Sequence, residues 1–128
     1  MVKASVVAVN RFDKFLLLQR NKDAPWMPRK WNLPGGIINE NESPEDAGKR
    51  ETLEESNLKL NNIKFIALYH FEHADIYLYT STAFENKVKI DFESMNFGWF
   101  TIDEAEKLDS VPYLSEFLKI AINYRQLI

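Results

Sequence analysis

Residues 36–58 read GIINENESPEDAGKRETLEESNL, and this stretch decides how the rest of the 128-residue chain is interpreted. Ser43 can cap a helix and Asp46 can complete a capping box, so we expect a helix over 44–56. Asn57 suits the left-handed conformation in which many helices end. The stretch therefore predicts a loop followed by one well-delimited helix.

One face of this expected helix is acidic, although side chains in that sector of a helix would normally be apolar. At about 100° per residue, Glu51, Glu54 and Glu55 fall within one sector of roughly 100°. Like charges at this spacing destabilise a helix by about 0.2–0.5 kcal/mol per pair, and such local conflicts concentrate at functional sites. Because Mg²⁺ takes oxygen ligands from a few carboxylates, the pattern favours a divalent cation site. A solvated charged face is the alternative interpretation.

The spacing of the stretch resembles the signature of the Nudix hydrolases, G-x5-E-x7-R-E-U-x-E-E-x-G-U, in which U is a bulky aliphatic residue. Upstream, LLLQR followed by WNLPGG is similar to the strand and loop that precede this box in MutT-like members. Asn57 replaces the final glycine of the signature, and Thr52 replaces an aliphatic residue. The signature is matched at Gly36, Glu42, Arg50, Glu51, Glu54, Glu55 and Leu58.

The resemblance implies a metal site on the acidic face. Glu51, Glu54 and Glu55 would bind Mg²⁺ or Mn²⁺, and a backbone carbonyl of Gly35 or Gly36 would be a further ligand. Glu51 is the first candidate for the group that takes a proton from the attacking water. The resemblance therefore implies catalytic roles for Glu51, Glu54, Glu55 and Arg50, and metal binding by the three glutamates and by Gly35 or Gly36.

The resemblance also implies residues that support this site. Arg50 would pair with Glu42 and hold the carboxylates in position. Arg20 and Gly36 are the candidates for substrate binding, although a solvated loop is the alternative for Arg20. Many relatives carry a further acid ahead of the late tryptophan, and the candidates for it here are Glu93, Asp91 and Glu85.

The composition bounds the class of protein. The absence of cysteine excludes disulfide scaffolds and a cysteine nucleophile, and a net charge of −3 excludes nucleic-acid binding by bulk charge. Residues 40–55 hold seven acidic and two basic side chains, a local charge of −5, and the remaining 12 acidic and 14 basic side chains give +2. No targeting segment or membrane span is visible, so we expect a cytoplasmic protein.

The sequence pattern predicts an α/β (α+β) fold over one domain, residues 1–128. It is expected to be an α/β/α sandwich of the Nudix type, with a mixed sheet and the box helix packed beside it. A capping box predicts a short helix over 101–108, and helical spacing predicts a last helix that begins near Leu114. The predicted strands are 2–9, 15–20, 63–71, 75–84, 88–90 and 97–100, with an extended segment over 31–38.

The resemblance implies a Mg²⁺-dependent hydrolase of nucleoside diphosphates linked to another moiety. Because the chain has no visible N-terminal extension of the kind common in dimeric nucleotide-sugar hydrolases, we expect a (d)NTP pyrophosphatase that releases NMP and pyrophosphate. Nucleotide-sugar, ADP-ribose and dinucleoside polyphosphate hydrolases stay open, as does a non-catalytic nucleotide-binding module. The expected partner is a small nucleotide, with no nucleic acid and no membrane, and the chain is expected to be a monomer or homodimer.

Overall fold

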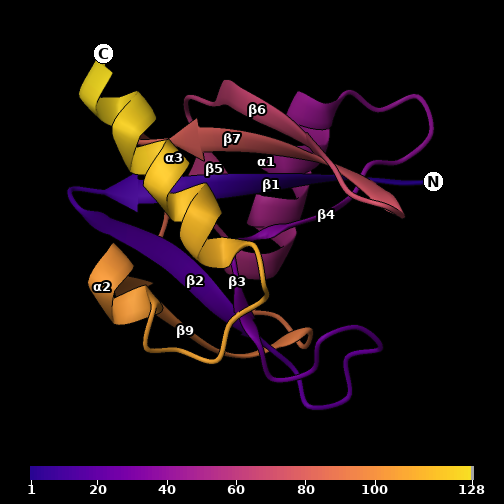
Figure 1. The fold of residues 1–128 in the computed structure, drawn as a ribbon, viewed down its shortest axis with the longest axis horizontal. Helices are drawn as coiled ribbons and strands as arrows, with labels where there is room; N and C mark the ends of the chain where they lie inside the picture. Colours follow the sequence, from indigo (N-terminus) through magenta and orange to yellow (C-terminus); the bar gives the residue numbers. More distant parts are fainter. Residues whose placement is uncertain (128) are drawn as a thin grey trace.

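In a computed structural model, which describes residues 1–127 and the side chains of residues 1–124, strand β1 (Val2–Arg11) lies at the centre of a mixed sheet (Figure 1). It runs parallel to β7 (Ala74–Ser81) and antiparallel to β2 (Lys14–Arg20) and β4 (Gly35–Ile37). Within residues 1–127 seven strands form this sheet, and the other three are β3 (Trp31–Asn32), β6 (Lys64–His70) and β9 (Ser94–Phe100). The predicted mixed sheet is confirmed.

The segment after β2 changes its strand partner at Pro34. Before this proline β3 pairs with β2, and after it β4 pairs with β1, where Gly35 lies opposite Val6. The N–H of Val7 also donates to the Pro34 carbonyl at 3.0 Å. The predicted break in the extended segment 31–38 is thus the point where the chain changes its strand partner. As a result, both glycines of the Pro-Gly-Gly sequence pair with the central strand β1.

Alternate side chains of β1 point into two hydrophobic cores, one on each face of the sheet. Val6 belongs to the core that α3 (Leu114–Leu127) covers, whereas Val7 lies on the side of α1 (Pro44–Ser56). Figure 1 shows the two helices on opposite sides of the sheet. The expected α/β/α sandwich is confirmed, and residue 128, the last of the predicted domain, lies outside the described residues.

α1 begins and ends at the predicted residues, and of the predicted capping box the structure shows the half that Ser43 supplies. The Ser43 hydroxyl accepts a hydrogen bond from the Asp46 N–H at 3.0 Å, which satisfies one of the free donors of the first turn. At the other end Asn57 adopts φ 67° and donates its N–H to the Leu53 carbonyl at 2.9 Å. Asparagine therefore takes the place of the signature's glycine in the left-handed turn that ends the helix.

The short helix α2 (Ile102–Ala105) begins with a full capping box. The Thr101 hydroxyl accepts from the Glu104 N–H, and the Glu104 carboxylate accepts from the Thr101 N–H. The helix ends earlier than the predicted 101–108, because the chain continues in tighter turns closed by hydrogen bonds three residues apart. Within residues 1–127 the structure contains no helix whose length and apolar character would let it cross a membrane.

The prediction of a strand over 88–90 is wrong, because this segment forms no strand in the described structure. The Lys89 N–H donates instead to the Ser56 carbonyl at 2.9 Å, while Val88 and Ile90 pack against the core on the α1 side. The alternating apolar residues therefore serve core packing and not strand pairing.

The strand predicted over 75–84 ends at Ser81, and the strand predicted over 97–100 begins earlier, at Ser94. The chain turns after Ser81 because the Asn62 side-chain carbonyl accepts from the Ser81 hydroxyl and from the next two backbone N–H groups. Beyond the turn the chain forms a short separate strand, β8 (Phe84–Glu85), which pairs with a strand that the sequence did not predict, β5 (Lys59–Leu60).

Candidate active site

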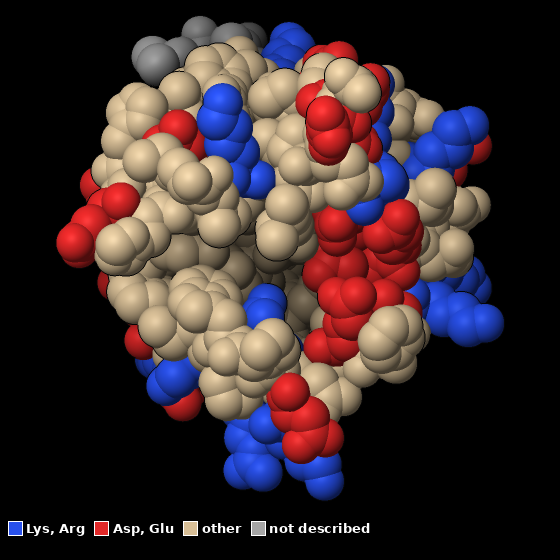
Figure 2. All heavy atoms as spheres, turned by 90° about the vertical axis from the view of Figure 1, so that its right-hand side faces the viewer, with Lys and Arg blue, Asp and Glu red and all other residues tan. Residues whose placement is uncertain are grey.

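The three predicted carboxylates lie close together on α1, where Glu51 and Glu55 face the Gly35–Gly36 segment of β4. The part of α1 that contacts β1 buries only small side chains, Ala47, Gly48, Thr52 and Ser56. The side chain of Glu51 is 17% exposed and that of Glu54 is 54% exposed. Figure 2 shows acidic side chains gathered along one side of a hollow in the molecular surface.

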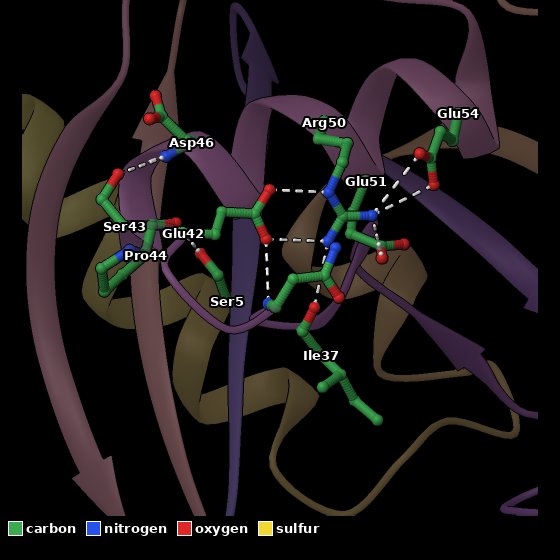
Figure 3. A network of polar contacts seen from close by, with 10 residues as sticks. Ser5, Ile37, Glu42, Ser43, Pro44, Asp46, Arg50, Glu51 and Glu54 are labelled. Atoms are coloured by element: carbon green, nitrogen blue, oxygen red, sulfur yellow. Dashed lines mark hydrogen bonds and ion pairs between the residues drawn. The ribbon is translucent and has the colours of Figure 1, made fainter.

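Arg50 joins these carboxylates to the loop before the helix (Figure 3). Its Nε and Nη2 bind the two oxygens of Glu42 at 2.7 and 3.0 Å, and its Nη1 lies 2.8 Å from Glu51 Oε1 and 3.3 Å from Glu54 Oε2. Nη2 also donates to the Ile37 carbonyl at 3.1 Å. The predicted Arg50–Glu42 pair is confirmed, and the guanidinium holds two of the three helix carboxylates as well.

The hydrogen bonds of this network set the ionisation of its members. The pKa of Glu42 is lowered because the carboxylate accepts from Arg50 and from the Asn39 N–H. The same bond with Glu42 is the largest cause of the raised pKa of Arg50. Both groups are therefore charged at neutral pH, and the bidentate geometry fixes the guanidinium plane.

The glycine pair allows the loop backbone to reach the carboxylates. A Cβ atom on Gly36 would lie 2.6–2.8 Å from the carboxylate atoms of Glu51, which is closer than van der Waals contact permits. A Cβ on Gly35 would collide with the backbone of β1, and the Gly35 N–H donates to Glu55 Oε1 at 2.8 Å. A side chain at Gly35 would therefore press on β1, whereas one at Gly36 would displace the Glu51 carboxylate.

The carboxylates repel one another in a partly buried setting. Burial is the main reason why the pKa of Glu55 is raised well above its ordinary value, and the charges of Glu51, Glu93 and Asp91 raise it further against the opposing Gly35 hydrogen bond. Burial also raises the pKa of Glu51, although Arg50 opposes this shift. Such crowding is what a bound cation would relieve.

The donor set fits a hard divalent cation. The available groups are carboxylate and carbonyl oxygens, which Mg²⁺ and Mn²⁺ prefer. Among the described residues no three acidic or histidine side chains converge on a single point, because Arg50 engages Glu51 and Glu54 while Glu55 bonds to Gly35. The carboxylates are thus adjacent but held by other partners, and a cation would compete with those partners for them.

A cleft of about 560 Å³ opens beside these residues. Arg20 lines it together with Gly35 and Glu55, as its place at the end of a strand directed toward the box predicts. The Arg20 Nε donates to the Trp26 carbonyl at 2.7 Å, and the guanidinium carbon lies 5.2 Å from the centre of the Trp26 ring. The cleft is lined by Leu18, Arg20, Asn21, Asp23, Ala24, Pro25, Asn32, Leu33, Gly35, Glu55, Phe92, Glu93 and Ser94.

One of the three candidate acids that follow the box in sequence lies at this cleft. Of the three candidates, Glu93 lines the cleft with Glu55, and both Glu93 and Asp91 are close enough to raise the pKa of Glu55. Asn21, which joins two loops at the cleft, is missed by sequence reasoning, because its partners lie far away in the chain. No local pattern could have indicated it.

Comparison with known proteins places these features in a family. The model of the NUDIX domain matches residues 1–119, a range that includes the box helix, both glycines and the cleft. The chain belongs to the Nudix family.

Individual curated relatives match this Nudix domain over only part of its length. An oxidized purine nucleoside triphosphate hydrolase of Danio rerio is 35% identical over 81 residues, which are 59% of this chain and 51% of that protein. The chain spans about half, or less, of the length of the curated relatives that it matches.

Solved structures agree with the sandwich fold over almost the whole chain. A MutT NUDIX hydrolase from Burkholderia pseudomallei superposes with a TM-score of 0.82 and 25% identity, covering 92% of this chain and 95% of that one. A MutT protein from Methanosarcina mazei Go1, at 20% identity, gives a TM-score of 0.85 over 98% of this chain and 95% of that one. At 20% identity, the likeness to the Methanosarcina mazei protein shows only that the two chains share a fold.

Proposed function

We propose that this chain is a Mg²⁺-dependent hydrolase, with Mn²⁺ as the alternative ion, that cleaves nucleoside triphosphates to NMP and pyrophosphate. The single observation that carries the proposal is the placement of Glu51 and Glu55 against the Gly35–Gly36 backbone, with Glu54 held near them by Arg50, beside a cleft that also contains Arg20. The printed name of the Danio rerio relative, a triphosphate hydrolase, supports a triphosphate substrate.

Glu51, Glu54, Glu55 and the Gly35 carbonyl would hold the cation. When bound, the ion supplies charge neutralisation of the diphosphate and a water of lowered pKa. Arg50 positions the carboxylates, since its guanidinium is fixed by Glu42 and reaches Glu51 and Glu54. The chain's part is therefore to keep several carboxylates together in a place where they would otherwise repel one another.

Glu51 is our choice for the residue that takes the proton of the attacking water. Its Oε1 is occupied by Arg50, so its Oε2 is left to accept the proton. Its raised pKa brings the carboxylate closer to the range in which a general base works well at neutral pH. Glu55 is less suited, because its Oε1 already accepts from the Gly35 N–H and its carboxyl is the more buried of the two.

The cleft would receive the rest of the substrate. Its volume of about 560 Å³ lies in the range of small-molecule sites, and Arg20 places a cation there for an outer phosphate. The Gly36 backbone, which approaches Glu51 closely, would border the substrate phosphates. We propose one domain that acts on a free nucleotide, as a monomer or homodimer.

The proposal is tested by supplying the wild-type protein with nucleoside triphosphates, nucleotide sugars, ADP-ribose and dinucleoside polyphosphates in Mg²⁺, and identifying the products. We expect NMP and pyrophosphate from a triphosphate, and a loss of about 1,000-fold in turnover for Glu55→Gln. Glu116→Gln, an exposed glutamate on α3, is the matched control and should keep wild-type turnover.

Each other outcome points to a different function. Turnover of another substrate class alone would replace the triphosphate assignment with that class. Nucleotide binding without any turnover would indicate a non-catalytic module, and full turnover by Glu55→Gln would overturn the assignment of the site.

A further inference from the structure

Two loops without regular secondary structure meet at the rim of the cleft. One follows β2 and spans 21–30, and the other precedes β9 and carries Phe92 and Glu93. The ladder between β2 and β9 ends with Arg20 opposite Ser94, after a shift in register. Beyond that point the sheet no longer holds the two loops together.

Asn21 continues the connection past the end of the ladder. Its backbone N–H donates to the Glu93 carbonyl at 3.0 Å, and its side-chain Nδ2 donates to the Phe92 carbonyl at 3.0 Å. Its Oδ1 accepts from the Asp23 N–H at 3.3 Å, and its own carbonyl accepts from the Ala24 N–H at 3.2 Å. One residue thus shapes the first loop and bonds to two consecutive carbonyls of the second.

The second loop is held near α1 at its start, where the Lys89 N–H donates to the Ser56 carbonyl and Ile90 packs against the core. Phe92 is 83% exposed, so its ring does not anchor the segment in the core. The Asp91 carboxylate accepts from the Glu93 N–H at 3.1 Å, which shapes the turn locally but does not tie it to the rest of the protein. The bonds from Asn21 therefore hold the Phe92–Glu93 end of this loop, between its contact with α1 at Lys89 and the start of β9.

We propose that Asn21 is a positioning residue that holds Glu93 beside Glu55 at the cleft, and so sets how tightly the acidic site binds a divalent cation. This inference rests on the proposed function, because it takes the carboxylates as the cation site. The supporting geometry is the shared lining of the cleft by Asn21, Glu93 and Glu55, together with the two bonds between the loops. Residues that orient metal-binding groups commonly change metal affinity by about 10–100-fold when replaced.

Three variants separate the parts of this role. Asn21→Ala removes both side-chain bonds, whereas Asn21→Ser keeps an oxygen for the turn at Asp23 but is too short to reach Phe92. Asn62→Ala is the matched control, because Asn62 also holds a loop through its amide but is not part of the cleft lining. The readouts are Mn²⁺ affinity by calorimetry without substrate, and turnover as a function of Mg²⁺.

We expect both Asn21 variants to bind Mn²⁺ about 10-fold more weakly than the wild type, and to recover most turnover at high Mg²⁺. A merely structural role would lower thermal stability without changing the metal affinity of the folded protein, which is the result expected for Asn62→Ala. Wild-type Mn²⁺ affinity in Asn21→Ser and Asn21→Ala would overturn the proposal.

A double-mutant cycle tests whether Asn21 acts through Glu93. In a Glu93→Gln background, Asn21→Ala should weaken Mn²⁺ binding no further, because the positioned group is already lost. A full additional 10-fold loss would contradict the proposal. If the wild type binds Mn²⁺ but hydrolyses no nucleotide, the proposed function fails while this cycle still decides the role of Asn21.

Discussion

The helices α1 and α3 cover opposite faces of the same sheet, but they pack by different means. α3 buries large apolar side chains, among them Leu114 and Phe117, whereas α1 buries small ones. A Cβ on Gly48 of α1 would lie 3.0 Å from atoms of both Ser5 and Val7, so this helix lies close against β1. The close approach is what brings the α1 carboxylates to the glycine backbone of the neighbouring loop.

The difference indicates that the two helices have different tasks: packing of α3 mainly stabilises the fold, and α1 mainly carries the functional side chains. Burial of apolar area stabilises a fold roughly in proportion to that area, so the α3 side contributes more than the small residues of α1 can. The carboxylates of α1 that face β4 repel one another and lower stability. Changes in α3 should therefore affect folding, and changes in the α1 carboxylates should affect function.

The largest effect on stability is expected from Phe117→Ala in α3. Phe117 is fully buried and contacts the rings of Tyr69 and Tyr113, so its removal leaves a cavity in the core. We expect the free energy of unfolding in urea to fall by about 3–5 kcal/mol. Turnover per folded molecule should stay near the wild-type value, and a selective loss of turnover would break the division between the two helices.

Substitutions of the adjacent Gly35 and Gly36 should separate an effect on folding from an effect on turnover. Gly36→Ala would push the end of the Glu51 side chain, which can move, so we expect nearly wild-type stability and a loss of turnover of about 100-fold. Gly35→Ala would press on the backbone of β1 at Ser5, which cannot move, so folding itself should suffer. Circular dichroism melts and steady-state kinetics of both variants check this contrast, and equal melting losses would contradict it.

Thr52→Val tests the packed face of α1. The Thr52 hydroxyl is buried and, among the described residues, finds no hydrogen-bond partner. Because an unsatisfied buried hydroxyl is costly, we expect valine to raise the free energy of unfolding by about 1 kcal/mol without changing turnover. A destabilised Thr52→Val variant in urea melts would show that the hydroxyl is satisfied in solution.

The smallest expected effect is a pH dependence of stability in metal-free protein. The folded-state pKa of Glu55 is raised above its ordinary value of 4.5, so between these two values the folded state holds a proton that the unfolded state has released. The contribution of Glu55 is therefore greatest at low pH and is lost as the pH rises through the folded-state pKa. In chelator, Glu55→Gln should show a smaller fall in unfolding free energy with rising pH, and an unchanged slope would contradict the assignment.

Local features of the sequence predicted most of α1 and its site. The caps at Ser43 and Asn57 follow from residue types at short spacing, the Arg50–Glu42 pair follows from the resemblance to the Nudix signature, and the structure confirms each of them. The bonds between Asn21 and the loop of Phe92 join residues 71 positions apart, so no local pattern encodes them. The strand predicted at 88–90 failed for a related reason, since its apolar alternation is satisfied by packing on a distant core.

The most direct test of the central claim, that the Glu51, Glu54 and Glu55 carboxylates of α1 form a divalent cation site, is calorimetric titration of metal-free protein with Mn²⁺. The wild type and Glu116→Gln should bind Mn²⁺ with equal affinity, because Glu116 lies on the other helix. Glu55→Gln should bind at least about 10-fold more weakly, since it loses a carboxylate of the site. Equal binding by all three proteins, or no binding by the wild type, would contradict the account.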